Sequence, residues 1–196
     1  MSEYTALRAA SRTLHALLKR EITDSGEPEI GGIPIDLRSP KELRGDGVQT
    51  AVSLWLYRVT RNAELLNAPP ERLSATEMRG SGLPLTLHFL VTPIADDTGV
   101  EQVLFGRALQ VLQDHAIVRG ADFADSLAGE RAELRVSLDT LSLEEITRVW
   151  DALKEPYELS ASYRVQVLTI DSAREPLQVA PVIERRSGLA QITATR

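Results

Sequence analysis

The stretch at residues 83–94, LPLTLHFLVTPI, is the feature that most limits how this chain can fold. Its alternating pattern predicts a buried β-strand. One face of that strand is wholly apolar and carries Leu85, Leu87, Phe89 and Val91. The other face is semi-polar and is expected to be half covered; it carries Thr86, His88, Leu90 and Thr92. A polar turn at residues 95–99 and an amphipathic run at 100–118 predict that a helix follows, and the rest of the chain should pack on this pair.

The same reading of periodicity predicts the other elements. Helices are expected over residues 4–21 and, after the capping-box serine Ser142, over residues 143–154. Strands are expected over 48–60, 132–139 and 157–170, and an extended or edge segment over 30–37, where Pro34 cannot donate to a central ladder. Residues 39–47, 69–82 and 120–129 are expected to be loops, and 176–186 a further extended run. Because strands often follow one another directly, we expect an α+β fold with a mostly antiparallel sheet flanked by helices.

Composition restricts the class of protein. A chain of 196 residues, 43% hydrophobic and 26% charged, is expected to form one globular domain at residues 1–186, with a mobile tail at 187–196. The net charge of -6, with no clustered bases, argues against nucleic acid as a partner. The absence of cysteine excludes disulfides and thiolate ligands. No stretch approaches the roughly 20 apolar residues that cross a bilayer, and no secretory signal is recognised, so we expect a cytoplasmic protein without membrane insertion.

Asp97-Thr98-Gly99 is the motif that most suggests an enzyme. An apolar strand leading into Asp-Thr-Gly is typical of small homodimeric aspartic proteases, in which two aspartates share a proton. A helical pattern follows here at once, however. The favoured interpretation is therefore that Asp97 or Thr98 caps the helix, because a side-chain oxygen there accepts backbone N–H groups.

No other catalytic, cofactor or metal site is predicted. The histidines His15, His88 and His115 have no partner at metal-ligand spacing, and His115 is better explained by a helix C-terminus. The chain has neither a Gly-x-Ser-x-Gly elbow nor a phosphate-binding glycine loop. The basic run Glu184-Arg185-Arg186 is compatible with a partner contact or with a solvated strand end.

Several segments, in this order, resemble one family. They are residues 52–67 (VSLWLYRVTRNAELLN), 83–92 (LPLTLHFLVT), 104–114 (LFGRALQVLQD) and 141–163, which contains LSLEEITRVW and the later residues Pro156, Tyr157, Leu159, Ser160 and Tyr163. The resemblance covers roughly residues 4–186. It is to the cap, or tail terminator, domain of extracellular contractile injection systems, the phage-tail-like particles of the virulence-cassette and antifeeding-prophage type.

This resemblance implies a structural protein without enzymatic activity. It would form a hexameric ring at the end of the tail distal to the baseplate, where it would close the inner tube and anchor the last sheath layer. The implied partners are other copies of itself and the tube and sheath proteins. A head-to-tail adaptor of a true phage remains an alternative that differs only in its partner. Some family members carry sequence beyond this domain, so a role that needs that extension is not expected here.

A closed ring needs a head-to-tail contact between unlike surfaces. The extended segments at 30–37 and 177–183 offer backbone edges for such a contact. We expect the second of these to continue as an arm that engages a neighbouring subunit or the sheath. The interface residues predicted for this arm are Val179, Val182, Ile183, Glu184, Arg185 and Arg186.

Overall fold

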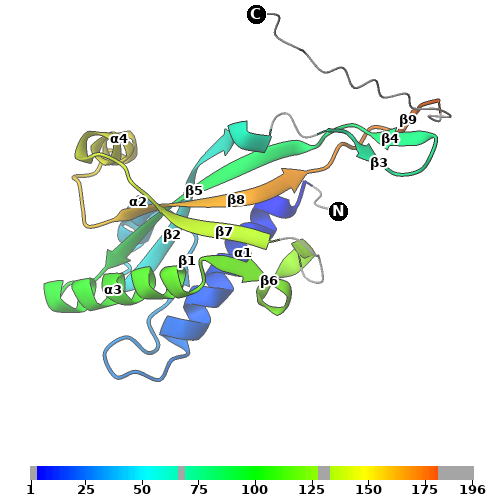
Figure 1. Cartoon of the computed structure of the whole chain (residues 1–196). Helices are drawn as coiled ribbons and strands as arrows, with labels where there is room; N and C mark the ends of the chain where they lie inside the picture. Colours follow the sequence, from blue (N-terminus) through cyan, green and yellow to red (C-terminus); the bar gives the residue numbers. More distant parts are fainter. Residues whose placement is uncertain (1–3, 66–68, 128–132, 181–196) are drawn as a thin grey trace, which may run out of the picture.

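A computed structural model describes residues 4–65, 69–127 and 133–180 of the chain. Its helices and strands are arranged in layers around a long central sheet (Figure 1). The α-helices are α1 (Ala6–Leu18), α2 (Pro40–Gly45), α3 (Thr98–Asp114) and α4 (Leu143–Leu153). The strands are β1 (Ile35–Asp36), β2 (Ala51–Arg61), β3 (Glu71–Arg72), β4 (Glu77–Arg79), β5 (Leu83–Ile94), β6 (Ile117–Arg119), β7 (Glu133–Asp139), β8 (Ala161–Ile170) and β9 (Leu177–Gln178).

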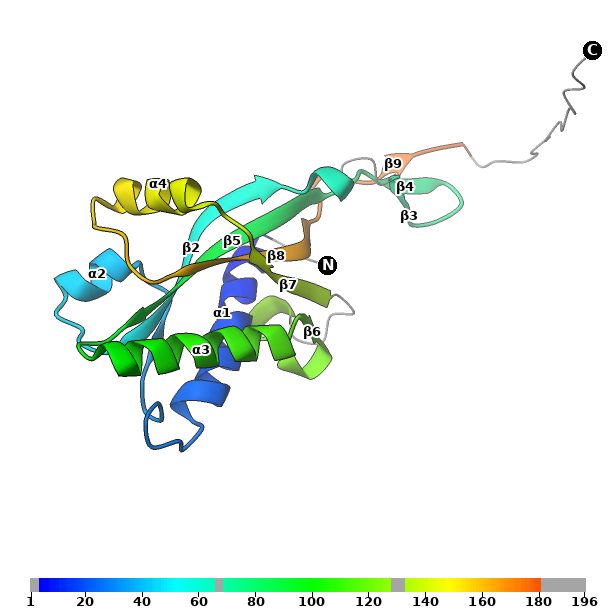
Figure 2. The same cartoon turned by 60° about the vertical axis from the view of Figure 1, so that its left-hand side comes forward.

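The main sheet has six strands in the order β1-β2-β5-β8-β7-β6. All neighbouring strands in it are antiparallel except β1 and β2, which run parallel. The expected α+β fold with a mostly antiparallel sheet is therefore confirmed. Strands β3, β4 and β9 form a separate antiparallel sheet, which we call the ribbon. The ribbon lies at the far end of β5 and β8, away from the helices (Figures 1 and 2).

The two faces of the main sheet are covered differently. Helices α1 and α3 pack on one face and α4 packs on the other (Figure 2). The larger core includes the predicted apolar face of β5 together with Leu14 and Leu18 of α1 and Leu104 of α3. The smaller core joins Leu90 of β5 to Ile146, Trp150 and Leu153 of α4. This arrangement follows from the periodicity of each helix, because residues three and four apart share one face.

The second face of β5 is more deeply buried than its sequence predicts. Thr86, His88, Leu90 and Thr92 are all buried, rather than half covered. Leu90 lies under α4, and His88 is enclosed by side chains from β2 and β7. The sequence pattern of β5 could not show what covers this face, because the covering elements α4 and β7 come later in the chain, after α3.

Two segments predicted to be loops contain regular structure. Residues 40–45 form α2, because Ser39 and Glu42 make a capping box and Pro40 occupies the first turn, where its missing N–H costs nothing. Residues 71–79 form the β3–β4 hairpin of the ribbon. Helix α3 also ends at Asp114, earlier than expected, and the chain then forms β6. The capping box at Ser142 and Glu145 is confirmed.

The extended segments end up in different sheets. Of residues 30–37, only Ile35 and Asp36 form a strand, and it lies at the edge of the main sheet, as expected for a segment containing Pro34. The expected run at 176–186 contributes β9 to the ribbon rather than a strand to the main sheet. Residues 181–196 lie outside the described residues, so the domain boundary at 186 and the mobile tail stay predictions.

Candidate interaction surfaces

The ribbon contains the first of the predicted interface residues. The backbone N–H of Val179 donates to the carbonyl of Thr76 over 2.8 Å, which extends the contact between β9 and β4 by one residue. Gln178 Nε2 donates to Glu77 Oε1 over 3.1 Å beside it. The other predicted interface residues, Val182, Ile183, Glu184, Arg185 and Arg186, lie outside the described residues. The ribbon therefore carries the chain outward to the point where the predicted arm begins.

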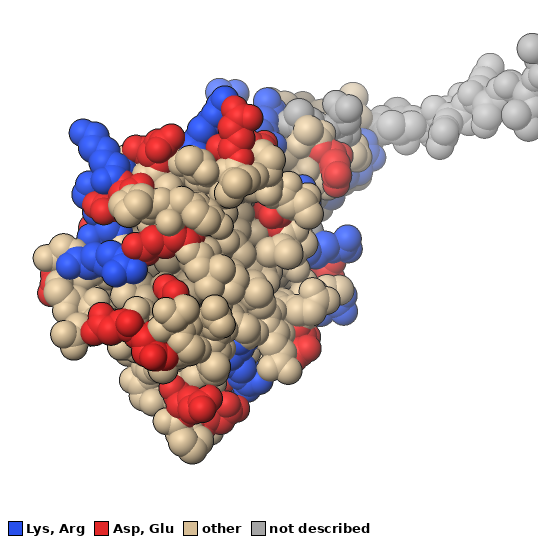
Figure 3. Space-filling model, turned by 90° about the vertical axis from the view of Figure 1, so that its left-hand side faces the viewer, with Lys and Arg blue, Asp and Glu red and all other residues tan. Residues whose placement is uncertain are grey.

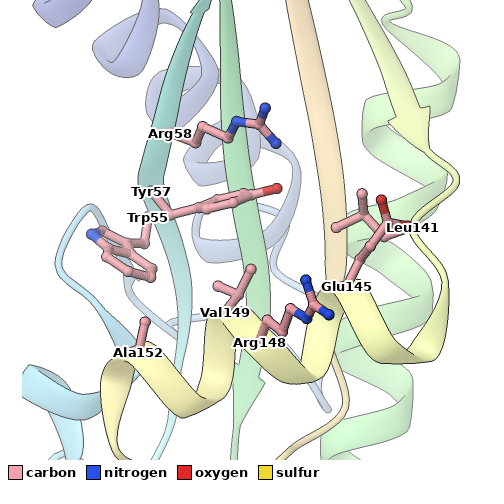
Figure 4. Close-up of a pocket in the computed structure, with 8 residues that line it drawn as sticks. All are labelled: Trp55, Tyr57, Arg58, Leu141, Glu145, Arg148, Val149 and Ala152. Carbon is pink, nitrogen blue, oxygen red and sulfur yellow. The ribbon is translucent and has the colours of Figure 1, made fainter.

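A groove runs between α4 and the exposed side of β2 (Figure 4). Its volume is about 460 Å³, and its lining residues are Trp55, Tyr57, Arg58, Leu141, Glu145, Arg148, Val149 and Ala152. The rings of Trp55 and Tyr57 lie 6.0 Å apart at its floor. Burial raises the pKa of the Tyr57 phenol, whose oxygen lies 2.9 Å from Ser162 Oγ. Aromatic and arginine side chains of this kind are enriched where proteins contact other proteins.

Beside this groove, a polar network connects three strands through His88. His88 Nδ1 lies 3.2 Å from Asp139 Oδ2 on β7, and His88 Nε2 lies 3.1 Å from Thr60 Oγ1 on β2. Arg164 Nε of β8 lies 3.2 Å from the other oxygen of Asp139. Burial lowers the pKa of His88 even though the carboxylate of Asp139 opposes that shift, so the folded protein favours the neutral ring.

This network was not predicted from the sequence, because its members are 28 and 51 residues apart along the chain. A hydroxyl, an imidazole and a carboxylate in series resemble the order of a nucleophile, a base and an orienting acid. Asp139 lines a hollow between α4 and the ends of β7 and β8, whereas neither Thr60 nor His88 lines any of the main pockets of the described residues, so the hydroxyl and the imidazole do not face a common cavity with the carboxylate. The network is better explained as hydrogen bonding that satisfies buried polar groups and links β2, β5 and β7.

Asp97 is the N-cap of α3. Its Oδ1 accepts the backbone N–H of Val100 over 2.9 Å, which confirms the helix-cap interpretation. Gly99 makes room for this contact, because a Cβ at that position would lie 3.0 Å from Asp97 Oδ1. The Asp-Thr-Gly sequence therefore serves the start of the helix, and nothing in its geometry favours the protease alternative.

The other two histidines also have local structural roles. His15 Nε2 lies 3.0 Å from the carbonyl oxygen of Ile35, and His115 follows the last turn of α3, with Nδ1 2.9 Å from the carbonyl oxygen of Val111. Nowhere in the described residues do three His, Asp or Glu side chains gather closely enough to hold a metal ion. No helix in the described part of the chain is both long and apolar enough to cross a membrane.

Comparisons with known proteins found solved structures with a similar fold. No curated protein matches the chain. Over its whole length the chain resembles the sheath/tube terminator, in the extended state, of an extracellular contractile injection system, PVC (TM-score 0.65, 17% identity, covering 67% of that protein). Over 96% of its length it resembles the tube terminating cap of the anti-feeding prophage (TM-score 0.61, 16% identity, covering 62% of that protein). At these identities the two likenesses establish a shared fold.

The match to a family model is broader than any single motif. The model of the Pvc16 N-terminal domain matches residues 9–185, which include all of α2, α3, α4 and both sheets, and all of α1 except its first three residues. The four segments that carried the resemblance in the sequence all lie within this range. The chain therefore belongs to the Pvc16 N-terminal domain family.

Proposed function

We propose that this chain is a structural tail terminator, or cap, of a phage-tail-like contractile injection system. The observation that carries the proposal is the family match over residues 9–185, together with the fold that the chain shares with two solved terminators. Those two proteins are a sheath/tube terminator and a tube terminating cap. The surfaces described above suit such a role, because the groove beside α4 and the edge strand β9 can each contact another protein.

In its finer form, the proposal is that six copies form a ring at the distal end of the particle. The ring closes the inner tube and anchors the last layer of sheath, so its partners are further copies of the chain and the tube and sheath proteins. Protein contacts alone carry this role, and the net charge of -6 argues against a nucleic acid partner. The chain would assemble in the cytoplasm as part of a particle that is later released.

The chain spans about two thirds of the length of the two solved terminators. A role of the remaining third of those proteins is therefore not transferred to this chain. Within the shared part, the proposed arm begins at Val179 and continues through Val182, Ile183, Glu184, Arg185 and Arg186. The support for it is that the ribbon leads the chain away from the main sheet just before these residues (Figure 1).

Electron microscopy of particles assembled with and without this chain tests the proposal. Without the chain, the tubes should lose their defined length or their closed end, because nothing stops addition of further tube subunits. Supplying the wild-type chain again should restore both properties. Particles that are capped and uniform in its absence would contradict the terminator role.

A further inference from the structure

Two groups of exposed large apolar side chains lie at opposite ends of this protein, while others, such as Leu37, Val103 and Ile117, lie singly elsewhere. Beside the ribbon, Tyr4, Leu83 and Leu177 are 84%, 46% and 67% exposed. At the other end, beside α4, Leu138, Leu143 and Tyr157 are 50%, 69% and 47% exposed. Contiguous exposed apolar surface on a soluble protein marks a site of interaction with another protein.

The group beside α4 lines a single hollow of about 440 Å³. It lies between α4 and the adjoining ends of β7 and β8, and its lining also includes Leu141, Ile146 and Ser160. Asp139 is the one charged lining residue, and it is already bound to His88 and Arg164. Figure 3 shows this end of the molecule, where charged side chains surround a broad uncharged area. The hollow therefore suits an apolar occupant.

The two apolar ends cannot meet within one subunit. Strand β8 connects them, because Tyr157 precedes it and Leu177 follows it. Its ten residues, at the rise of an extended strand, span about 30 Å. The two ends lie on opposite sides of the molecule in both views (Figures 1 and 2). A head-to-tail contact between copies joins two different surfaces of the subunit, and these two apolar ends form such a pair.

The ribbon has the properties expected of the occupant. On one side β9 pairs with β4, and among the described residues no strand pairs with its other side. Arg72 and Arg174 of this end are exposed and form no ion pair with a described residue. The ribbon therefore presents a strand edge, the apolar side chain of Leu177 and two exposed arginines to a neighbouring subunit.

We propose that the ribbon of one subunit docks, through Leu177, into the hollow beside α4 of the next subunit. Leu143 and Tyr157 cover Leu177 in this contact. The same contact repeated around an axis closes the ring. This inference rests on the proposed terminator function and names the two surfaces that join its subunits.

Thiol cross-linking in assembled particles tests the contact, because the natural chain has no cysteine. Particles capped with the double variant Leu143→Cys and Leu177→Cys should give a ladder of linked subunits under a short thiol cross-linker. The matched control pairs Leu177→Cys with Val103→Cys, because Val103 is also exposed but does not line the hollow. The control pair should give no ladder.

Two substitutions test the same contact without a cross-linking reagent. Leu143→Asp and Leu177→Asp each place a carboxylate in the proposed apolar contact and should reduce subunit association by about tenfold or more. Both residues are exposed, so the fold should be unchanged, and circular dichroism checks this. A mixture of the two variants retains one intact contact, between the ribbon of the Leu143→Asp chain and the hollow of the Leu177→Asp chain. It should therefore yield dimers but no rings in native mass spectrometry.

The outcomes separate this inference from the proposed function. Capped particles that contain the double-cysteine chain but show no ladder would overturn the docking and leave the terminator role standing. A single-cysteine variant that links to itself as efficiently as the double variant would also overturn it, because the contact would then join like surfaces. Particle ends that lack the chain altogether would remove the proposed function and the docking with it.

Discussion

Asp97 lies in the turn between β5 and α3, with its carboxylate bound to the backbone of the helix. A carboxylate at this position both accepts an N–H that has no partner in the helix and interacts favourably with the helix dipole. Gly99 suits the same arrangement, since a Cβ there would lie 3.0 Å from Asp97 Oδ1 and would crowd the cap. The three residues that suggest a protease in the sequence are therefore explained by their role at the start of α3.

Substitutions at Asp97 distinguish the cap from a catalytic role. Asp97→Ala should lower the free energy of unfolding by about 1 kcal/mol, because the N–H of Val100 loses its partner. Asp97→Asn keeps a cap oxygen and should cost little in urea denaturation. Particles capped with Asp97→Asn should be normal, whereas an aspartic protease would lose its function with that carboxylate. Asp96→Ala is the matched control, because the neighbouring residue is exposed and does not cap α3.

His88 makes stability depend on pH. Its pKa in the folded protein is lowered from the ordinary value of 6.5, mainly by burial, so the unfolded chain binds the proton more readily. The stability contributed by the neutral ring is therefore present above about pH 6.5 and is lost as the pH falls through the lower folded pKa. The charged groups facing the ring modify this effect of burial: Asp139 opposes the lowering of the pKa, and Arg58 and Arg164 add to it.

The comparison of wild type with His88→Gln isolates this contribution. Between about pH 7.5 and pH 5 the unfolding free energy of the wild type should fall more steeply than that of the variant, because the variant has no imidazole to protonate. Urea denaturation at several pH values measures both slopes. A shallower slope for the wild type would show that attraction between the imidazolium and Asp139 outweighs the burial of the ring.

At the scale of elements, α4 depends on both its cap and its contact face. The capping box at Ser142 and Glu145 supplies partners for exposed N–H groups at its start. Trp150 is 1% exposed and packs in the smaller core with Leu90, while its Nε1 donates to Ser160 Oγ over 3.0 Å. The helix thus forms one wall of both the groove at β2 and the hollow at β8.

Truncation of Trp150 should therefore loosen α4 from the sheet. Trp150→Ala should lower the unfolding free energy by about 3–5 kcal/mol, because it removes a buried aromatic side chain and leaves a cavity. Trp150→Phe should cost less, about 1–3 kcal/mol, because it loses mainly the hydrogen bond to Ser160. Tyr157→Ala is the control: its ring meets Trp150 edge-on but is half exposed, so its cost should be under about 1 kcal/mol. Equal losses for all three would contradict this packing.

At the scale of the molecule, the ribbon and the main sheet are two separate hydrogen-bonded sheets. The six-stranded sheet holds both cores, whereas the ribbon contributes no residue to any buried cluster of the described chain. A part with few buried contacts can be lost with little effect on the remainder. We therefore expect the main sheet and its helices to fold without β9.

Two truncations separate the ribbon from the arm. Ending the chain after Ala173 removes β9, and ending it after Ala180 removes the proposed arm residues from Val182 to Arg186 but keeps β9. Both proteins should melt within about 4 °C of the full chain. If the arm is needed, neither truncation should join tails in electron microscopy. If only the longer protein joins tails, the ribbon rather than the arm carries this function. If both proteins join tails, the arm is removed from the proposal.

Local patterns predicted most of the elements because they depend on neighbours in the chain. The period of two in β5 and β8 and the capping box of α4 are visible in a few consecutive residues, and all three were found where expected. The helix α2 was missed although Ser39-Pro40 and Glu42 carry the same kind of signal. A helix of one to two turns has too few residues to show a period, so its cap was the only local indication.

The sequence by itself determined the apolar face of β5, the α+β class, a helix cap at Asp97 or Thr98 and the family to which the chain belongs. Only the tertiary structure decided that Thr60, His88 and Asp139 meet, that the last strand joins the ribbon, and that Leu143 and Leu177 lie at opposite ends. The physical reason is that periodicity and capping are local, whereas the order of strands and the cover of each face depend on which distant segments bury the most apolar surface together.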